Sequence, residues 1–178
     1  MDKLTLKRIE TAHPLLRDEL KCILADISVV IATNYAQFRF SHVLRTFKEQ
    51  DDLYAIGRTK PGRKVTNASG GNSNHNYGLA VDIVQLLDKD RNGSFESASW
   101  NLKHDADFDG IPDWDEVVDI FKRYGWSWGG LWRTPDSPHF EKTFGFTIQE
   151  LKKLPTDREG YPIFNNSENV KKCDCNCT

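Results

Sequence analysis

A histidine and an aspartate flank a short apolar run in the stretch His75-Asn-Tyr-Gly78-Leu-Ala-Val-Asp82. The run from Leu79 to Val84 predicts a β-strand and is apolar except for Asp82, and a carboxylate there is unfavourable unless a cation or hydrogen-bond donors satisfy it. Residues seven apart in a strand face opposite sides, so His75 must precede the strand, on a turn that Gly78 permits, to meet Asp82. Imidazole and carboxylate are suitable zinc ligands, so the stretch predicts part of a zinc site.

A third ligand is expected from Asp136-Ser-Pro-His139-Phe-Glu141, a segment that Pro135 and Pro138 stiffen. Three protein ligands leave the fourth position of a tetrahedral zinc ion for water, which is the arrangement of a catalytic site. Asp136, three residues before His139, could take the proton of that water. Each histidine alone would more often be an ordinary surface or loop residue, but the two histidines together with the two acids favour hydrolytic zinc chemistry.

An acidic segment between these two groups fits the EF-hand calcium loop position by position. Gly110 permits its sharp turn, and the expected calcium ligands are Asp105, Asp107, Asp109, Ile111 (through its carbonyl), Asp113 and Glu116. No clear helix precedes this loop, so a single EF-like loop is predicted rather than a full hand. Upstream, Asp88-Lys-Asp90-Arg-Asn92-Gly93 begins the same pattern, but its twelfth position is Ser99, and whether the segment from Asp88 to Glu96 binds calcium is left open. The alternative for both segments is a solvated acidic loop.

Hydrophobic periodicity indicates the elements that position these residues. We expect helices over residues 14–31, 47–56, 114–124 and 147–153, and strands over residues 37–44, 79–86 and 138–142. Residues 58–76 and 88–113 have the composition of loops, and residues 125–130 that of a turn rich in glycine and tryptophan. Without an inter-domain linker or a repeat, the chain is predicted to form one α+β domain.

The composition is that of an ordinary soluble protein, with 178 residues, 38% hydrophobic and 28% charged, and a formal net charge of -2. No basic patch favours nucleic acid. The N-terminus has no signal-peptide pattern, and the longest apolar stretch is too short to span a bilayer, so synthesis in the cytosol without membrane insertion is expected. Cys22 fits a helix core, whereas Cys173, Cys175 and Cys177 form a terminal pattern for which a frayed end, soft-metal binding and disulfides all stay open.

The composite pattern Ser73-x-His75-x-x-Gly78-x-Ala80-x-Asp82 with Asp136-x-x-His139 resembles the LAS metallopeptidases, in their D-Ala-D-Ala carboxypeptidase (VanY-like) branch. Within it, the chain is most similar to phage endolysins that cut the L-alanyl–D-glutamate bond of peptidoglycan. They share the Trp128-Gly-Gly-Leu-Trp132 run, the segment 45–50 and the segment 53–58, and the resemblance spans roughly residues 9–151. It implies an α+β fold with a small central antiparallel sheet and flanking helices, as in Hedgehog-like domains, and one zinc ion.

The resemblance also implies roles for single residues. The zinc ligands would be His75, Asp82 and His139, with Asp136 as the base and Arg45 facing the substrate carbonyl, where a fixed cation stabilises an oxyanion. The dipeptidase branch has glutamate at the position of Asp136, so aspartate favours the carboxypeptidase and endopeptidase branches. For the remaining residues the alternatives stay open: Ser73 binds substrate or shapes the turn, Arg45 could be a surface residue, and Trp128 and Trp132 line the cleft or fill the core.

The leading hypothesis is a monomeric, zinc-dependent phage endolysin acting on bacterial peptidoglycan, regulated by calcium and retained in the host cytoplasm until release to the wall. A bacterial D-alanyl-D-alanine carboxypeptidase and a non-catalytic calcium- or zinc-dependent binding protein are the alternatives. Residues 1–160 would form the catalytic domain with the EF-like insertion at 88–116, and residues 161–178 a polar cysteine-containing tail.

Overall fold

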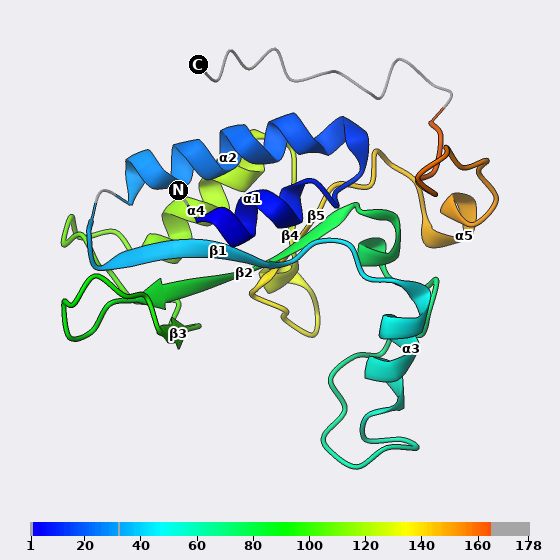
Figure 1. The fold of residues 1–178 in the computed structure, drawn as a ribbon, viewed down its shortest axis with the longest axis horizontal. Helices are drawn as coiled ribbons and strands as arrows, with labels where there is room; N and C mark the ends of the chain where they lie inside the picture. The colour runs from blue at the N-terminus through cyan, green and yellow to red at the C-terminus, as the bar shows by residue number, and fades with distance from the viewer. Residues whose placement is uncertain (1, 32, 165–178) are drawn as a thin grey trace.

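Strand β2 (Ala80–Leu87) is the centre of a five-stranded antiparallel sheet in the computed structural model, which describes residues 2–31 and 33–164. Strand β1 (Ala36–His42) pairs along one edge of β2. On the other edge, β5 (His139–Glu141) pairs with the first residues of β2 and β3 (Ser97–Ser99) with the last ones, while β4 (Ser127–Trp128) pairs with β5 (Figure 1). The predicted α+β fold with a small antiparallel sheet is confirmed.

Three helices cover one face of this sheet: α1 (Lys3–Ile9), α2 (Arg17–Val30) and α4 (Asp113–Arg123) (Figure 1). The core between them is aromatic and aliphatic, with the rings of Phe121 and Phe140 stacked at 4.0 Å between centroids. Because strand side chains alternate between the two faces, Val81 and Phe140 point into this core. Their neighbours Asp82 and His139 therefore belong to the opposite face, which these helices do not cover.

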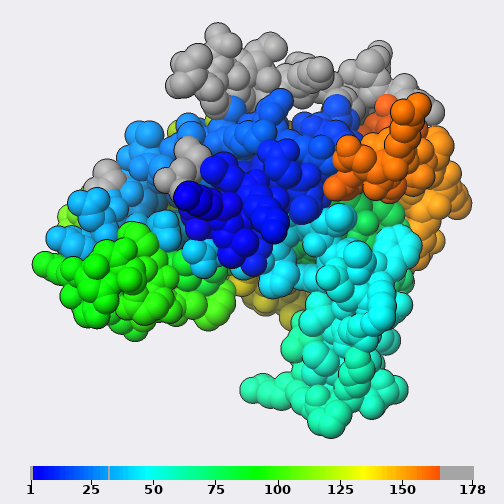
Figure 2. All heavy atoms as spheres, viewed as in Figure 1, coloured from blue at the N-terminus to red at the C-terminus, as the bar shows by residue number. Residues whose placement is uncertain are grey.

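Helix α3 (Phe47–Ala55) and the loop that follows it project away from the sheet as an arm (Figure 2). The helix begins with a capping box in which Thr46 and Glu49 satisfy each other's backbone N–H groups. The arm starts directly after Arg45, so the fold places this arginine at the junction between arm and sheet.

The helices and strands expected from periodicity are present within two residues of their predicted bounds, α5 (Ile148–Leu151) included, except that the helix expected over residues 14–31 begins as the 3-10 turn η1 (Pro14–Leu16) and continues as α2. The prediction missed α1, β3 and β4, the last of which lies in the turn expected over residues 125–130, and it missed the short 3-10 turns η2 (Asn74–Tyr77) and η3 (Gly129–Leu131). Within the described ranges, no helix is long and apolar enough to cross a membrane. Cys22 is buried, as expected, whereas Cys173, Cys175 and Cys177 lie outside the described residues.

The packed body extends past residue 160, the boundary expected from composition. Tyr161 is buried and its hydroxyl donates to the Thr11 carbonyl at 2.9 Å. The Phe164 ring stacks on buried His13 at 4.8 Å between centroids, and His13 Nε2 hydrogen-bonds the Pro162 carbonyl at 2.9 Å. Aromatic packing therefore holds residues 161–164 against the α1–α2 junction.

Candidate metal centre

Strand pairing brings Asp82 and His139 together. The two residues are direct cross-strand partners in the β2–β5 ladder, and opposite residues in an antiparallel pair lie on the same face. Asp82 Oδ1 is 3.0 Å from His139 Nδ1. Two of the predicted ligands are thus juxtaposed by backbone register, although they are 57 positions apart in sequence.

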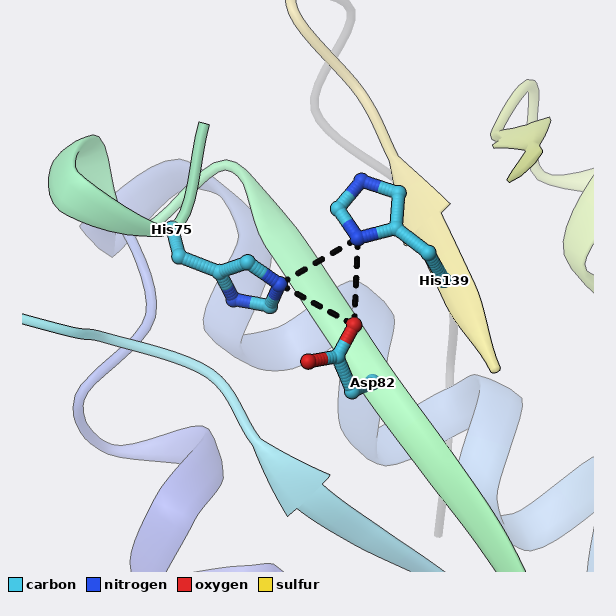
Figure 3. A group of neighbouring side chains, drawn as sticks. All are labelled: His75, Asp82 and His139. Atoms are coloured by element: carbon cyan, nitrogen blue, oxygen red, sulfur yellow. Dashed lines mark hydrogen bonds and ion pairs between the residues drawn. The ribbon is translucent and has the colours of Figure 1, made fainter. Parts of the chain in front are cut away.

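His75 reaches the same point from the turn η2, as the sequence required. Gly78 ends this turn in the left-handed conformation (φ 67°), which lets the chain reverse into β2. A side chain at position 78 would also collide with the backbone, since a Cβ there would lie 2.5 Å from His13 N. With the turn so fixed, His75 Nε2 lies 3.1 Å from Asp82 Oδ1 and 3.2 Å from His139 Nδ1 (Figure 3).

The hydrogen bonds behind the two histidines decide which ring nitrogens carry protons. His75 Nδ1 lies 2.7 Å from the Val43 carbonyl, an acceptor only, so this nitrogen donates and Nε2 keeps its lone pair. His139 Nε2 lies 3.0 Å from Glu141 Oε2, so it donates to the carboxylate and Nδ1 keeps its lone pair. When both imidazoles are neutral, as metal binding requires, two nitrogen lone pairs and one carboxylate oxygen therefore converge, an arrangement suited to a cation.

The spacing of this triad fits zinc. Ligand atoms bound at ~2.0–2.1 Å in a tetrahedron lie roughly 3.3–3.4 Å apart. The three donor atoms of His75, Asp82 and His139 are separated by 3.0–3.2 Å. Two imidazoles and one carboxylate also form the ligand set of hydrolytic zinc sites with an open fourth position. The residues present would thus hold one zinc ion.

Burial and mutual attraction shift the pKa values at this centre. Desolvation opposes ionisation of Asp82, but its hydrogen bonds to His139 and His75 outweigh burial and hold its pKa well below the usual range. Burial alone would lower the pKa of His139, yet the bonds to Asp82 and Glu141 raise it to about 9. The carboxylates of Asp82 and Glu141 therefore stabilise a positive charge next to them.

Asp136 lies one turn before His139, whose N–H donates to the Asp136 carbonyl at 3.1 Å. Its own N–H donates to the Gly129 carbonyl at 3.0 Å, which ties this turn to η3. The residue is exposed overall, but partial desolvation together with the Asp82 charge raises the pKa of its carboxyl group. A carboxylate with a raised pKa beside a metal centre suits a general base.

Arg45 lies on the arm side of the centre. Its Nη2 donates to Asp82 Oδ2 at 3.3 Å, and its Nη1 donates to Gln50 Oε1 at 2.9 Å. The guanidinium is only 14% exposed, so both bonds hold it in one position. The alternative of a surface arginine is therefore wrong, while its contact with substrate stays a prediction.

The predicted substrate-binding residues are placed differently from one another. Ser73 is the N-cap of η2, and its N–H donates to Asn76 Oδ1 at 3.3 Å, so its backbone shapes the turn. Trp128 packs against the core and its Nε1 donates to the Ser137 carbonyl at 2.8 Å, which braces the loop before His139. Trp132 is 40% exposed with its ring 5.0 Å from that of His139, so it alone of these two tryptophans borders the metal centre. Substrate contact by any of them stays a prediction.

Two residues at the centre received no role from the sequence. Gln50 is fully buried and accepts a hydrogen bond from Arg45, and Glu141 accepts a hydrogen bond from Nε2–H of His139. Glu141 could have been found by strand alternation, because it stands two residues after His139 and so shares its face. Gln50 lies in the segment 45–50 that contributes to the resemblance, but its role depends on partners up to 18 residues away and could not be read from that segment.

The acidic insertion gathers the predicted calcium ligands into two overlapping clusters. One contains Asp105, Asp107 and Asp113, and the other Asp107, Asp109 and Glu116, each with ligand atoms within 4.8 Å of one another. Gly110 has the expected positive φ of 93°. Asp113 is also fully buried, and its carboxylate accepts hydrogen bonds from Gln85 and from the Ala106 N–H. That carboxylate therefore also anchors the loop to β2.

Comparison with known proteins finds one matching family and two similar endopeptidases. The D-alanyl-D-alanine carboxypeptidase family matches residues 66–142, which contain all three members of the triad. The chain is 44% identical over 135 residues to the peptidoglycan L-alanyl-D-glutamate endopeptidase CwlK of Bacillus subtilis (strain 168), covering 72% of each chain. It is also similar to the crystal structure of the L-Ala D-Glu endopeptidase ChiX of Serratia marcescens, with a TM-score of 0.47, 20% identity, and coverage of 81% of this chain and 90% of that one.

Proposed function

Because the chain belongs to the D-alanyl-D-alanine carboxypeptidase family of metallopeptidases, we propose that it is a zinc-dependent peptidoglycan hydrolase that cuts the L-alanyl–D-glutamate bond of stem peptides. The observation that carries the chemistry is the convergence of His75 Nε2, Asp82 Oδ1 and His139 Nδ1 to within 3.0–3.2 Å of one another. The choice of bond rests on the 44% identity to CwlK over 72% of its length.

The remaining residues suit amide hydrolysis. A zinc ion held by the triad would polarise the scissile carbonyl and lower the pKa of a bound water molecule. Asp136 would take the proton of the attacking water and pass it to the leaving amine, for which its raised pKa is suited. Arg45, held by Gln50 and Asp82, would donate hydrogen bonds to the carbonyl oxygen as negative charge develops on it.

The bond is identified by the new chain ends. Incubation of the purified protein with peptidoglycan, followed by mass spectrometry, should show L-alanine C-termini and D-glutamate N-termini. Release of D-alanine instead would point to the carboxypeptidase activity that names the family, and intact stem peptides to a binding protein. Asp136→Ala should lose cleavage but retain zinc; loss of zinc would reassign Asp136 as a ligand.

Calcium regulation is a further part of the proposal. Asp107 Oδ1 and Glu116 Oε2 are buried acceptor atoms without a hydrogen-bond donor among the described residues, which is the condition a cation would relieve. Desolvation and the charges of four surrounding aspartates raise the pKa of Glu116 to about 7. Asp113 joins this loop to Gln85, three residues after Asp82 in β2, so calcium binding would stabilise the strand that carries a zinc ligand. Equal lysis with and without calcium, in the wild type and in Asp109→Ala, would refute regulation.

We propose further that the enzyme acts as a monomeric phage lysin that stays in the host cytoplasm until the membrane opens. A bacterial wall-remodelling enzyme is the second candidate, favoured by the bacterial source of CwlK. Fractionation of cells expressing the protein separates these roles. A lysin stays with the cytosol and clears the culture only after membrane permeabilisation, whereas a remodelling enzyme is found at the wall in intact cells.

A further inference from the structure

The two histidines of the triad are oriented by different kinds of partner. Behind His75 stands a backbone carbonyl, that of Val43, which no side-chain substitution removes. Behind His139 stands a side chain, because its Nε2 donates to Glu141 Oε2 at 3.0 Å. The orientation of His139 therefore depends on the identity of one residue.

Glu141 is itself held in place. It follows His139 by two positions in β5, so both side chains lie on the same sheet face. Asn74 Nδ2 donates to the same Oε2 atom at 2.8 Å. Asn74 directly precedes His75 in η2, so a continuous set of contacts runs from one histidine turn through Asn74 and Glu141 to the other histidine.

The contact has a chemical consequence for His139. A neutral imidazole carries one proton, on Nδ1 or on Nε2, and only the Nε2–H form presents a lone pair on Nδ1. Nδ1 is the atom that faces Asp82 Oδ1 and His75 Nε2. A carboxylate at Nε2 selects that form, fixes the ring plane and makes the ligand nitrogen more basic.

We propose that Glu141, braced by Asn74, is a positioning residue for the metal centre that acts through His139 and sets its affinity for zinc. This inference rests on the proposed zinc function. It assigns to Glu141 no contact with substrate and no proton transfer. Removal of a carboxylate that orients a ligand histidine typically weakens metal binding by about 10–100-fold.

The test measures zinc affinity directly, by competition of the full-length protein against a chromophoric chelator, and does not depend on activity. Glu141→Ala should bind zinc about 10–100-fold more weakly. Glu141→Gln keeps an acceptor oxygen for the His139 N–H and should recover most of this loss. The control Asp119→Ala removes one negative charge from a side chain that is 78% exposed, and should bind as the wild type does.

Cobalt substitution gives a readout that a merely structural role would not move. The visible spectrum of the Co²⁺ protein should shift in Glu141→Ala and be restored in Glu141→Gln, a change in the metal's ligand field that a loss of folding stability alone would not produce. Wild-type zinc affinity and an unshifted cobalt spectrum in Glu141→Ala would overturn the inference and leave the proposed function intact. Failure of the wild type itself to bind zinc would overturn both. If Glu141→Ala does not fold, Glu141→Leu takes its place as the variant without an acceptor, and wild-type zinc affinity in Glu141→Leu would overturn the inference.

Discussion

The acidic loop makes a quantitative prediction about pH, because Glu116 must lose its proton to bind calcium through both oxygens. Desolvation, followed by the charges of the neighbouring aspartates, raises its pKa from 4.5 to about 7. Roughly half of the carboxyl groups are then ionised at pH 7 and roughly one in eleven at pH 6. The apparent Kd for calcium should therefore rise about fivefold between pH 7 and pH 6, and fall less than about twofold between pH 7 and pH 8.

Calorimetric titration of calcium into the protein at pH 6, 7 and 8 measures this profile. Glu116→Gln provides the matched variant, because its amide cannot titrate: binding should be weaker at every pH and nearly flat across the range. A wild-type Kd that stays constant from pH 6 to pH 8 would show that Glu116 does not titrate as a ligand. Absence of calcium binding would refute the loop assignment altogether.

The same shift affects stability without calcium. Between pH 4.5 and about 7 the folded protein holds a proton on Glu116 that the unfolded chain has already released. Its contribution to the free energy of unfolding is thus present below pH 4.5 and declines as pH rises towards 7. With a chelator present, the melting temperature of the wild type should fall as pH rises towards 7, and that of Glu116→Gln should fall less. Adding calcium to the wild type should reverse the fall.

Three other substitutions test the framework around the centre. Glu19→Ala leaves the largely buried Lys142 ammonium without the carboxylate that it contacts at 2.7 and 2.8 Å. The free energy of unfolding, measured by urea titration, should fall by about 3–5 kcal/mol. A fall of less than about 1 kcal/mol would show that this ion pair contributes little to stability. Gly78→Ala places a side chain at a position with positive φ and against His13 N. It should lower the free energy of unfolding by at least about 2 kcal/mol and weaken zinc binding. An unchanged melting temperature would contradict this expectation. Arg45→Ala should reduce kcat about 100-fold or more while the zinc content stays unchanged. A variant with the kcat of the wild type would show that Arg45 does not stabilise the oxyanion.

The sequence identified the residues that would bind the metal more directly than it indicated how these residues are arranged in space. Asp82 stood out as a single acid in an apolar strand, and Gly78 indicated the turn that returns His75 to it. The pairing of Asp82 with His139 could not be read from either segment alone, because strand order and register depend on the whole sheet. The structure supplies that register and, with it, the role of Glu141.

Other features were not predicted from the sequence, because they depend on contacts between segments that are far apart in the chain. Helix α1 has only two buried residues, Thr5 and Ile9, so its apolar face is too narrow to give a clear period. The composition of residues 161–164 predicts part of a polar tail, yet ring contacts of Tyr161 and Phe164 with His13 hold this segment to the body. His13 is buried by that packing, and burial lowers its pKa.

The central claim is that one zinc ion, bound by His75, Asp82 and His139, makes this chain a peptidoglycan hydrolase. It is tested most directly by stripping the protein of metal, adding zinc in fractions of an equivalent, and counting the L-alanine C-termini released from peptidoglycan at each step. Cleavage should be absent without zinc, rise in proportion to it and stop rising at one equivalent, and His139→Ala should give no rise over this range. Full cleavage by the stripped protein, or a rise that continues to two equivalents, would contradict the claim.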